Sequence, residues 1–165
     1  MILGIDPGPV TCGAVLYDET ARRVSSSSSA APVDEVLDHW LPAAWDAADV
    51  IAIERVQAQG VAGGDIIRTA EVVGRLWQAT LDHGVDYGVV DVRLLYRREV
   101  LAALDVTGRG NRDALVRARL IEMHGGTKKA AQGTKKARGP LYGVSGHAWS
   151  ALGVAVAAQG AGRVG

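Results

Sequence analysis

The chain has 165 residues, 48% hydrophobic and 22% charged, a composition that indicates one ordinary globular domain rather than a disordered or membrane-spanning protein. Its 18 basic and 18 acidic side chains cancel, which by itself argues weakly against a nucleic-acid partner. The charges are unevenly distributed, however, because Glu122 is the last acidic residue and residues 123–165 carry only basic charges. A single cysteine, Cys12, excludes an intrachain disulfide framework and favours a reducing compartment such as the cytoplasm.

The first predicted strand, Met1–Asp6, is apolar up to its last residue, which is a carboxylate. Such an apolar run predicts a central strand covered on both faces, where a charge at the tip is costly unless it is paired or binds a metal. Gly8 and Gly13 flank the following turn and allow a close approach of backbone or substrate. Further strands are predicted at Thr11–Tyr17 and, more weakly, at Arg22–Ser27, so the chain begins as an antiparallel meander.

The middle of the chain alternates helical and strand patterns. Apolar residues at helical spacing predict a helix over 33–40, and Asp49–Ile53 reads as a second buried strand that again ends in a carboxylate, Glu54. A long helix is predicted over 65–82 and a further strand over 87–92. This order favours a mixed sheet with helices on both faces.

The last part of the chain is predicted to be mainly helical. Short and longer helices are expected at 97–104 and 112–124, and the final helix at 147–158. Between them, residues 125–140 are rich in Lys and Gly and are expected to form a flexible basic loop. The whole chain, 1–165, is expected to form one domain.

The two strand-terminal carboxylates are the main candidates for chemistry. If their strands are neighbours, Asp6 and Glu54 lie within a few ångströms of each other and offer the hard oxygen ligands that suit Mg²⁺ or Mn²⁺. Two such ions can activate water and stabilise the leaving oxygen in phosphodiester cleavage. The first turn of the last helix adds His147 and Ser150 on one face. The alternatives are a structural turn at Asp6 and a surface ion pair of Glu54 with Arg55 or another basic residue.

Three segments resemble, in this order, the RuvC family of Holliday-junction resolvases: Ile5-Asp6-Pro7-Gly8, Ile51-Ala52-Ile53-Glu54 and Ser145-Gly146-His147-Ala148-Trp149-Ser150. The loop Thr107-Gly108-Arg109-Gly110 also resembles the substrate-binding region of that family, and helix 65–82 resembles its dimer-forming helix. The resemblance spans nearly the whole chain. It implies an RNase H-like α/β fold, with a five-stranded mixed β-sheet flanked by α-helices. It also implies a homodimeric endonuclease that uses Mg²⁺ or Mn²⁺, two ions per site, to nick four-way DNA junctions symmetrically.

The resemblance further assigns roles to individual residues. Asp6 and Glu54 match the first two metal ligands of the family, and His147 matches the third. Ser150 stands where the family normally has an Asp, although a serine hydroxyl is a poor Mg²⁺ ligand, and no Asp or Glu elsewhere in the last helix can replace it. A natural variant, an inactive relative and a deliberately disabled protein all remain open, and replacement of an ancestral Asp is favoured.

Contact with DNA phosphates is expected mainly from basic side chains. Gln57 stands where relatives often carry an aromatic residue that inserts at the junction centre, a role in which Gln stacks poorly. The basic 125–140 segment can also be interpreted as a solvated loop, although phosphate contact is favoured, and Arg97 and Arg98 are equally compatible with ordinary surface residues. The expected DNA-binding residues are Gln57, Arg97, Arg98, Arg109, Arg112, Lys128, Lys129, Lys135, Lys136 and Arg138.

Other functions are compatible with the same residues. An RNase H-like nuclease acting on RNA–DNA hybrids is one alternative, and a catalytically silent junction-binding protein is another, because Ser150 weakens the metal site. An ATP-binding relative of the fold is disfavoured, because the second phosphate motif expected there is missing. A cytoplasmic enzyme of bacterial or phage origin is expected, with four-way junction DNA as its partner and no membrane contact.

Overall fold

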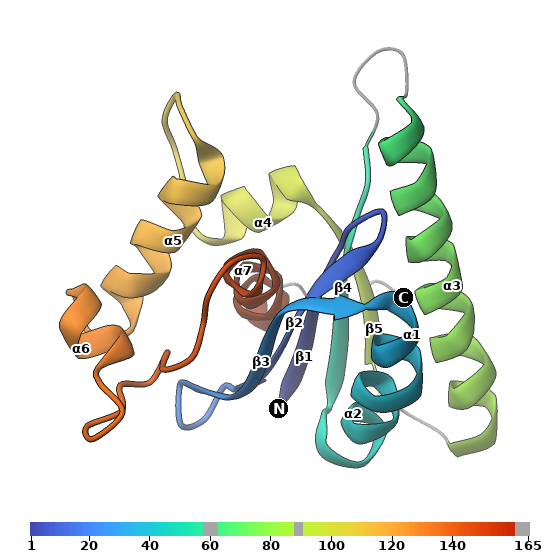
Figure 1. Ribbon diagram of the computed structural model, residues 1–165, viewed down its shortest axis with the longest axis horizontal. Helices are drawn as coiled ribbons and strands as arrows, with labels where there is room; N and C mark the ends of the chain where they lie inside the picture. The colour runs from blue at the N-terminus through green and yellow to red at the C-terminus, as the bar shows by residue number, and fades with distance from the viewer. Residues whose placement is uncertain (58–62, 88–90, 161–165) are drawn as a thin grey trace.

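A five-stranded mixed sheet forms the centre of the computed structural model, which describes residues 1–57, 63–87 and 91–160 (Figure 1). Its strand order is β3-β2-β1-β4-β5. β2 pairs antiparallel with both β1 and β3, while β4 pairs parallel with β1 and β5 pairs parallel with β4. The strands are β1 (Ile2–Pro7), β2 (Thr11–Asp18), β3 (Arg23–Pro32), β4 (Val50–Arg55) and β5 (Asp91–Tyr96).

Helices cover both faces of the sheet (Figure 1). One face packs against α1 (Val33–Glu35), a π-helical turn (Val36–Trp40), α2 (Leu41–Ala47) and α3 (Gly64–Tyr87). The other face packs against α7 (Ala148–Gly160), and beyond α7 lie α4 (Arg97–Ala103), α5 (Arg112–Met123) and α6 (Lys128–Gln132). These layers confirm the predicted RNase H-like α/β architecture.

The alternation of side chains along the central strands divides the core in two. Ile5 and Ile53 point toward α2 and α3, whereas Ala52 points toward α7. The helix α7 comes unusually close to β1 because Gly4 has no side chain, and a Cβ atom at Gly4 would lie 2.8 Å from the Cβ of Ala155. Since α7 lies between the sheet and α4 and α5, it is buried on nearly all sides, as its almost wholly apolar sequence requires.

Several predicted boundaries are wrong. The strand expected at 87–92 is displaced, because α3 runs on through Gly84 to Tyr87 and β5 begins at Asp91. Gly84 lowers helix propensity by only about 1 kcal/mol, which is too little to end a helix that is already anchored by Val72 and Leu76. The helix expected at 33–40 is instead divided between α1 and the π-helical turn. The third strand extends to Pro32, which is tolerated at the end of an edge strand.

The basic segment 125–140 is not a loop throughout. It contains α6, whose first turn is capped by the side chain of Thr127, which accepts a hydrogen bond of 3.2 Å from the backbone N–H of Ala130. Lys128 and Lys129 are therefore held on a short helix, while Lys135, Lys136 and Arg138 follow it in a turn. Among the helices that the structure describes, none combines the length and the apolar character needed to cross a bilayer.

Candidate active site

Asp6 and Glu54 leave the sheet at the same edge. Ile5 of β1 is paired with Ile53 of the parallel strand β4, so the residues that follow them lie side by side. Because Ile5 and Ile53 point toward α2 and α3, the two carboxylates point to the opposite face, where α7 begins. Both are largely buried, with side chains 20% and 14% exposed respectively. The predicted convergence of the two strand-terminal carboxylates is confirmed.

The beginning of α7 brings His147 and Ser150 to the same place. Nδ1 of His147 lies 3.6 Å from Oδ2 of Asp6, and the Ser150 hydroxyl lies near enough to the Asp6 carboxyl to lower its pKa slightly. The His147 side chain is 71% exposed, so most of the imidazole surface is accessible to a ligand or to solvent. Asp6, Glu54, His147 and Ser150 line one cavity of about 310 Å³, so the structure brings these four candidate residues together.

Burial disfavours the charged forms of both carboxyl groups. Burial raises the pKa of Asp6 to about 6, although the charges of His147 and Arg97 act in the opposite direction. Burial likewise raises the pKa of Glu54 to about 7, against the lowering effect of Arg97, and the nearby Asp6 charge raises it further. A pair of carboxyl groups with raised pKa values, at the tips of adjacent strands, is a typical binding site for a cation.

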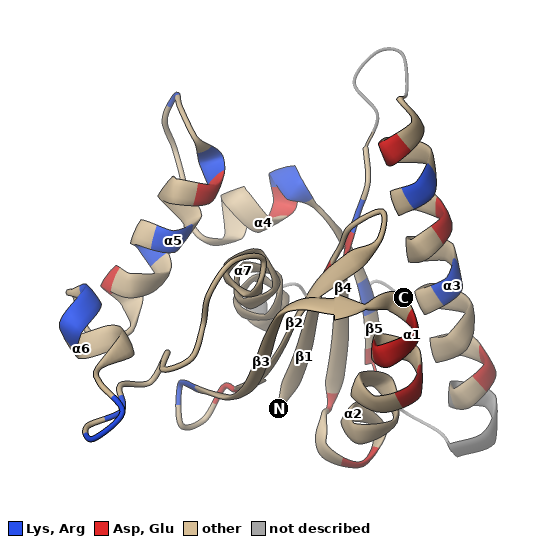
Figure 2. Ribbon diagram, in the orientation of Figure 1, with Lys and Arg blue, Asp and Glu red and all other residues tan. Residues whose placement is uncertain are grey.

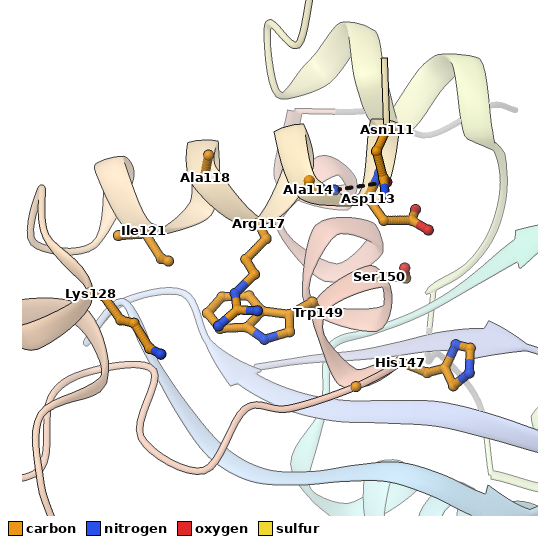
Figure 3. A pocket seen from close by; sticks show the side chains of 11 residues that line it. Asn111, Asp113, Ala114, Arg117, Ala118, Ile121, Lys128, His147, Trp149 and Ser150 are labelled. Atoms are coloured by element: carbon orange, nitrogen blue, oxygen red, sulfur yellow. Dashed lines mark hydrogen bonds between the residues drawn. The ribbon is translucent and has the colours of Figure 1, made fainter.

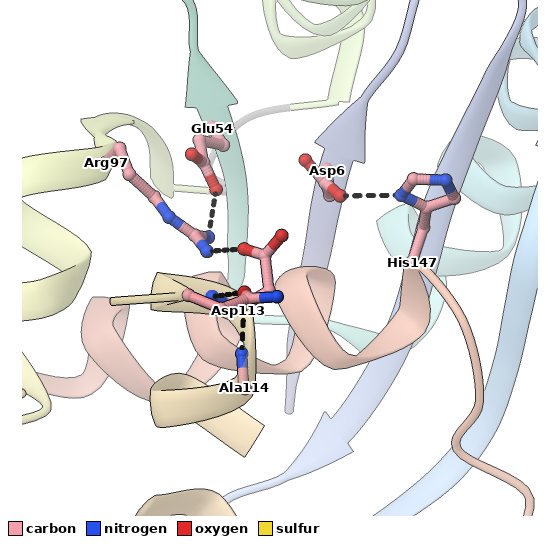
Figure 4. A network of polar contacts seen from close by, with 7 residues as sticks. Asp6, Glu54, Arg97, Asp113, Ala114 and His147 are labelled. Atoms are coloured by element: carbon pink, nitrogen blue, oxygen red, sulfur yellow. Dashed lines mark hydrogen bonds and ion pairs between the residues drawn. The ribbon is translucent and has the colours of Figure 1, made fainter. Parts of the chain in front are cut away.

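Arg97 and Asp113 extend the polar network beyond the four predicted residues (Figure 4). The guanidinium of Arg97, the first residue of α4, lies 3.3 Å from Oε2 of Glu54 and also donates a hydrogen bond to Asp113. Glu54 therefore pairs with another basic residue, Arg97, inside the site, and not with Arg55, which lies over the ring of Tyr96. Arg97, expected to contact DNA, is held by carboxylates inside the site.

Asp113 is a residue of the site that we did not predict from the sequence. It belongs to the first turn of α5, which Asn111 caps by accepting hydrogen bonds from the backbone N–H groups of Asp113 and Ala114. The capping residue and the preceding glycine loop can be recognised in the sequence. No sequence pattern near Asp113 indicates, however, that α5 begins beside Glu54. Asp113 lines the same 310 Å³ cavity as the four predicted residues.

The residues present fit a divalent cation by their chemistry, because buried carboxylates are the ligands that Mg²⁺ and Mn²⁺ prefer. They do not form a finished cage. Within residues 1–57, 63–87 and 91–160, no group of three or more His, Cys, Asp and Glu side chains is spaced to hold a metal ion. The positive charge beside Glu54 is supplied by Arg97, with which an incoming cation would compete.

Some of the predicted DNA-binding residues surround the carboxylates. A neighbouring cavity of about 430 Å³ joins Asp6 and Glu54 to side chains from the end of β4, α4 and α5. Its predicted DNA-binding residues are Gln57, Arg97, Arg98 and Arg112. Arg109 does not line this cavity, and it lies exposed in the loop before α5.

A larger cavity of about 650 Å³ follows α5 and α7 away from the site (Figure 3). It begins at His147, Ser150 and Asp113 and reaches Lys128 of α6. Between these ends, the guanidinium of Arg117 lies 5.1 Å from the centre of the Trp149 ring. Positive charges continue over α6 and the turn behind it, at the end of the molecule opposite α3 (Figure 2). Lys129, Lys135, Lys136 and Arg138 lie there, outside the cavities that contain the carboxylates.

Comparisons with known proteins identify the fold. No family model matches the sequence, and no curated protein matches it. The structure is similar to RuvC of Thermus thermophilus in complex with a Holliday junction substrate, with a TM-score of 0.57 and 18% identity, covering 94% of this chain and 90% of that chain. A second Thermus thermophilus RuvC structure has a TM-score of 0.54 and 18% identity over 94% of this chain and 91% of that chain. The chain thus shares the RuvC fold over nearly its full length.

Proposed function

We propose that this chain is a cytoplasmic, single-domain endonuclease that cleaves four-way DNA junctions with the help of Mg²⁺ or Mn²⁺. The observation that carries the proposal is the convergence of Asp6, Glu54 and His147 at one edge of a RuvC-like sheet. A RuvC structure of the same fold contains a Holliday junction. The combination of fold and site supports a nuclease more strongly than either alone, because folds host many functions and the site decides between them.

The metal would be held by Asp6, Glu54 and His147. When bound, two such ions would activate a water molecule and stabilise the leaving oxygen of the phosphodiester. The protein itself orients the donors on rigid elements, since Asp6 and Glu54 end adjacent strands and His147 precedes a buried helix. The expected products are a 5′-phosphate and a 3′-hydroxyl.

We propose that the DNA lies along the two cavities that extend from the carboxylates. The arginines beside Glu54 would contact phosphates next to the cleaved bond, and the cavity along α5 leads to the lysines of α6. A phosphate backbone binds such side chains through charge, without regard to sequence. The uneven charge of the chain, neutral in total but basic at this end, is consistent with that path.

We propose a homodimer through α3, since two copies related by a two-fold axis would place two sites on a two-fold substrate. Apolar and small residues follow a heptad pattern along this helix: Ile67, Ala70, Gly74, Trp77 and Leu81. Ile67 and Leu81 are 53% and 43% exposed, although both are large and apolar. No atom lies within 4 Å of a Cβ built at Gly74, which leaves room for a second helix to approach closely.

A specific observation also favours a second candidate, a junction-binding protein that does not cleave. Ser150 supplies a hydroxyl where a carboxylate is expected, and the Glu54 carboxylate is already ion-paired with Arg97. Such a protein would bind the junction through the same surface and leave it intact.

Cleavage of a labelled four-way junction tests both candidates. The natural chain, Ser150→Asp and Asp6→Asn are compared with Mg²⁺ and with Mn²⁺, and binding is measured in parallel by gel shift. We expect metal-dependent cleavage that is faster in Ser150→Asp and lost in Asp6→Asn. Binding without cleavage, even in Ser150→Asp, would identify the silent binding protein. An RNA–DNA hybrid added as competitor separates the remaining alternative, because a hybrid-specific nuclease would cleave the hybrid first.

A further inference from the structure

Asp113 brings to the site a carboxylate that does not come from the last helix. It lines the same cavity as Asp6, Glu54 and Ser150. Figure 4 shows its carboxylate between the Arg97 guanidinium and Asp6. The site therefore contains three carboxylates, one each from β1, β4 and α5.

The position of Asp113 is fixed by the way α5 begins. Gly108 and Gly110 adopt φ values of +130° and +127°, so the loop turns in a conformation that other residues avoid. The side chain of Asn111 then caps the helix through the N–H of Asp113 itself. Further along α5, Val116 packs against Gly153 of α7, where a Cβ would approach it to 3.1 Å. The first turn of α5 is thus anchored to the helix that carries Ser150.

Arg97 places a positive charge between two of these carboxylates, Glu54 and Asp113. Its side chain is only 24% exposed and interacts with Glu54 on one side and with Asp113 on the other. Two carboxylates from distant parts of the chain sharing one positive charge are the arrangement that a divalent ion also requires. An ordinary surface ion pair of Asp113 with Arg97 would explain the contact with Arg97, but it would give Asp113 no effect on metal binding.

We propose that Asp113 supplies the carboxylate that is missing at Ser150. The spacing of Asp6, Glu54 and Asp113 around Arg97 does not itself hold a metal ion, so a divalent cation would displace the Arg97 guanidinium and draw the three carboxylates together beside His147. This inference rests on the proposed function and concerns the metal ligands of the same site. It locates the compensating acid on α5 rather than on α7, and it predicts that Asp113 and an acid at position 150 can replace each other.

Binding of Mn²⁺ to the full chain, measured from the free Mn²⁺ signal in electron paramagnetic resonance, tests the inference without any cleavage. Relative to the natural chain, Asp113→Asn is expected to weaken binding about tenfold or more, and Asp113→Glu to keep it within about threefold. Adding Ser150→Asp to Asp113→Asn is expected to restore binding to within about threefold of the natural chain. Because the Asp113 side chain is 75% exposed, its replacement should leave the fold intact. Circular dichroism checks that each variant is folded before binding is measured.

The matched control is Glu122→Gln, which also removes a carboxylate from α5 that is paired with an arginine, in this case Arg119. It should leave Mn²⁺ affinity unchanged. The inference is overturned if Asp113→Asn binds as well as the natural chain, if Glu122→Gln weakens binding equally, or if the natural chain binds no Mn²⁺. A different result would contradict the proposed function and leave the role of Asp113 intact: Mn²⁺ is bound as expected, but neither the natural chain nor Ser150→Asp cleaves a junction.

Discussion

Gly13 lies directly against the backbone of His147. A Cβ at position 13 would lie 2.6 Å from the carbonyl carbon of His147, a distance at which one of the two must move. Gly13 is also the cross-strand partner of Asp6 in the antiparallel pair β1–β2. The absence of a side chain at one position of β2 therefore lets His147 settle beside Asp6.

Replacing Gly13 by Ala tests this relationship. The added methyl group should displace the start of α7, and overpacking of this kind costs about 1–3 kcal/mol of unfolding free energy. Urea denaturation measures that loss, and Mn²⁺ titration should show weaker binding because His147 moves from Asp6. Gly64→Ala is the control, because nothing lies within 4 Å of a Cβ there and a helix favours Ala. Equal stability of Gly13→Ala and the natural chain would contradict the close contact.

The raised pKa values predict how stability depends on pH in the metal-free protein. The pKa of Asp6 is about 6, above its ordinary 3.8, so the folded state binds more protons than the unfolded state between these values. The stability contributed by the protonated form is complete below pH about 4 and is lost as the pH rises through about 6. The raised pKa of Glu54, about 7, extends this loss to neutral pH.

Asp6→Asn isolates this effect. The variant cannot ionise at position 6, so between pH 4 and pH 7 its free energy of unfolding should rise by about 2 kcal/mol relative to that of the natural chain. Urea unfolding across this range in the presence of a chelator measures the difference. Asp46→Asn, at an exposed position on α2, should follow the natural chain at every pH. Parallel curves for Asp6→Asn and the natural chain would show that Asp6 is not destabilised by burial.

The heptad stripe on α3 predicts the assembly state. Ile67→Glu combined with Leu81→Glu places two charges on the exposed apolar stripe, where desolvation in an interface is costly, so the protein should become monomeric. Sedimentation velocity at micromolar concentration distinguishes monomer from dimer. Arg68→Glu also adds negative charge to α3, but on another side of the helix, and loses only an exposed ion pair of 3.8 Å. This control should remain a dimer, and a monomeric natural chain would refute the proposed assembly.

The basic end of the molecule predicts a steep salt dependence of DNA binding. Each phosphate contact contributes about 0.9 to the slope of log affinity against log salt, so replacing Lys128, Lys129, Lys135 and Lys136 by Gln should reduce the slope by about 3 to 4. Fluorescence anisotropy with a four-way junction at several salt concentrations provides the measurement. Replacing Arg68 and Arg75 on α3 by Gln, at the opposite end of the molecule, should leave the slope unchanged (Figure 2). An unchanged slope in the lysine variant would place the DNA elsewhere.

Much of this protein could be predicted from local patterns in its sequence. An apolar strand that ends in an acid is visible in Met1–Asp6 and again in Asp49–Glu54, because side chains alternate along a strand and burial selects apolar residues. Helix caps such as Asn111 are equally local, since the capping side chain and the N–H groups it accepts from are neighbours in sequence. The long helix α3 was found for the same reason, although its end was missed because the cost of Gly84 is too small to end a helix that is already anchored in the core.

The tertiary structure alone decided which charges meet. Arg97 lies 43 residues from Glu54 and 16 residues from Asp113 in the sequence, so no local pattern reveals that its guanidinium joins them. That meeting depends on the parallel register of β1 and β4, on the packing of α5 against α7, and on the close approach of α7 that Gly4 and Gly13 permit. The sequence by itself determined that carboxylates end two buried strands. Only long-range packing determined that a third carboxylate and an arginine would lie beside them, because such contacts arise from the fit of whole elements rather than from the residues next to them in the chain.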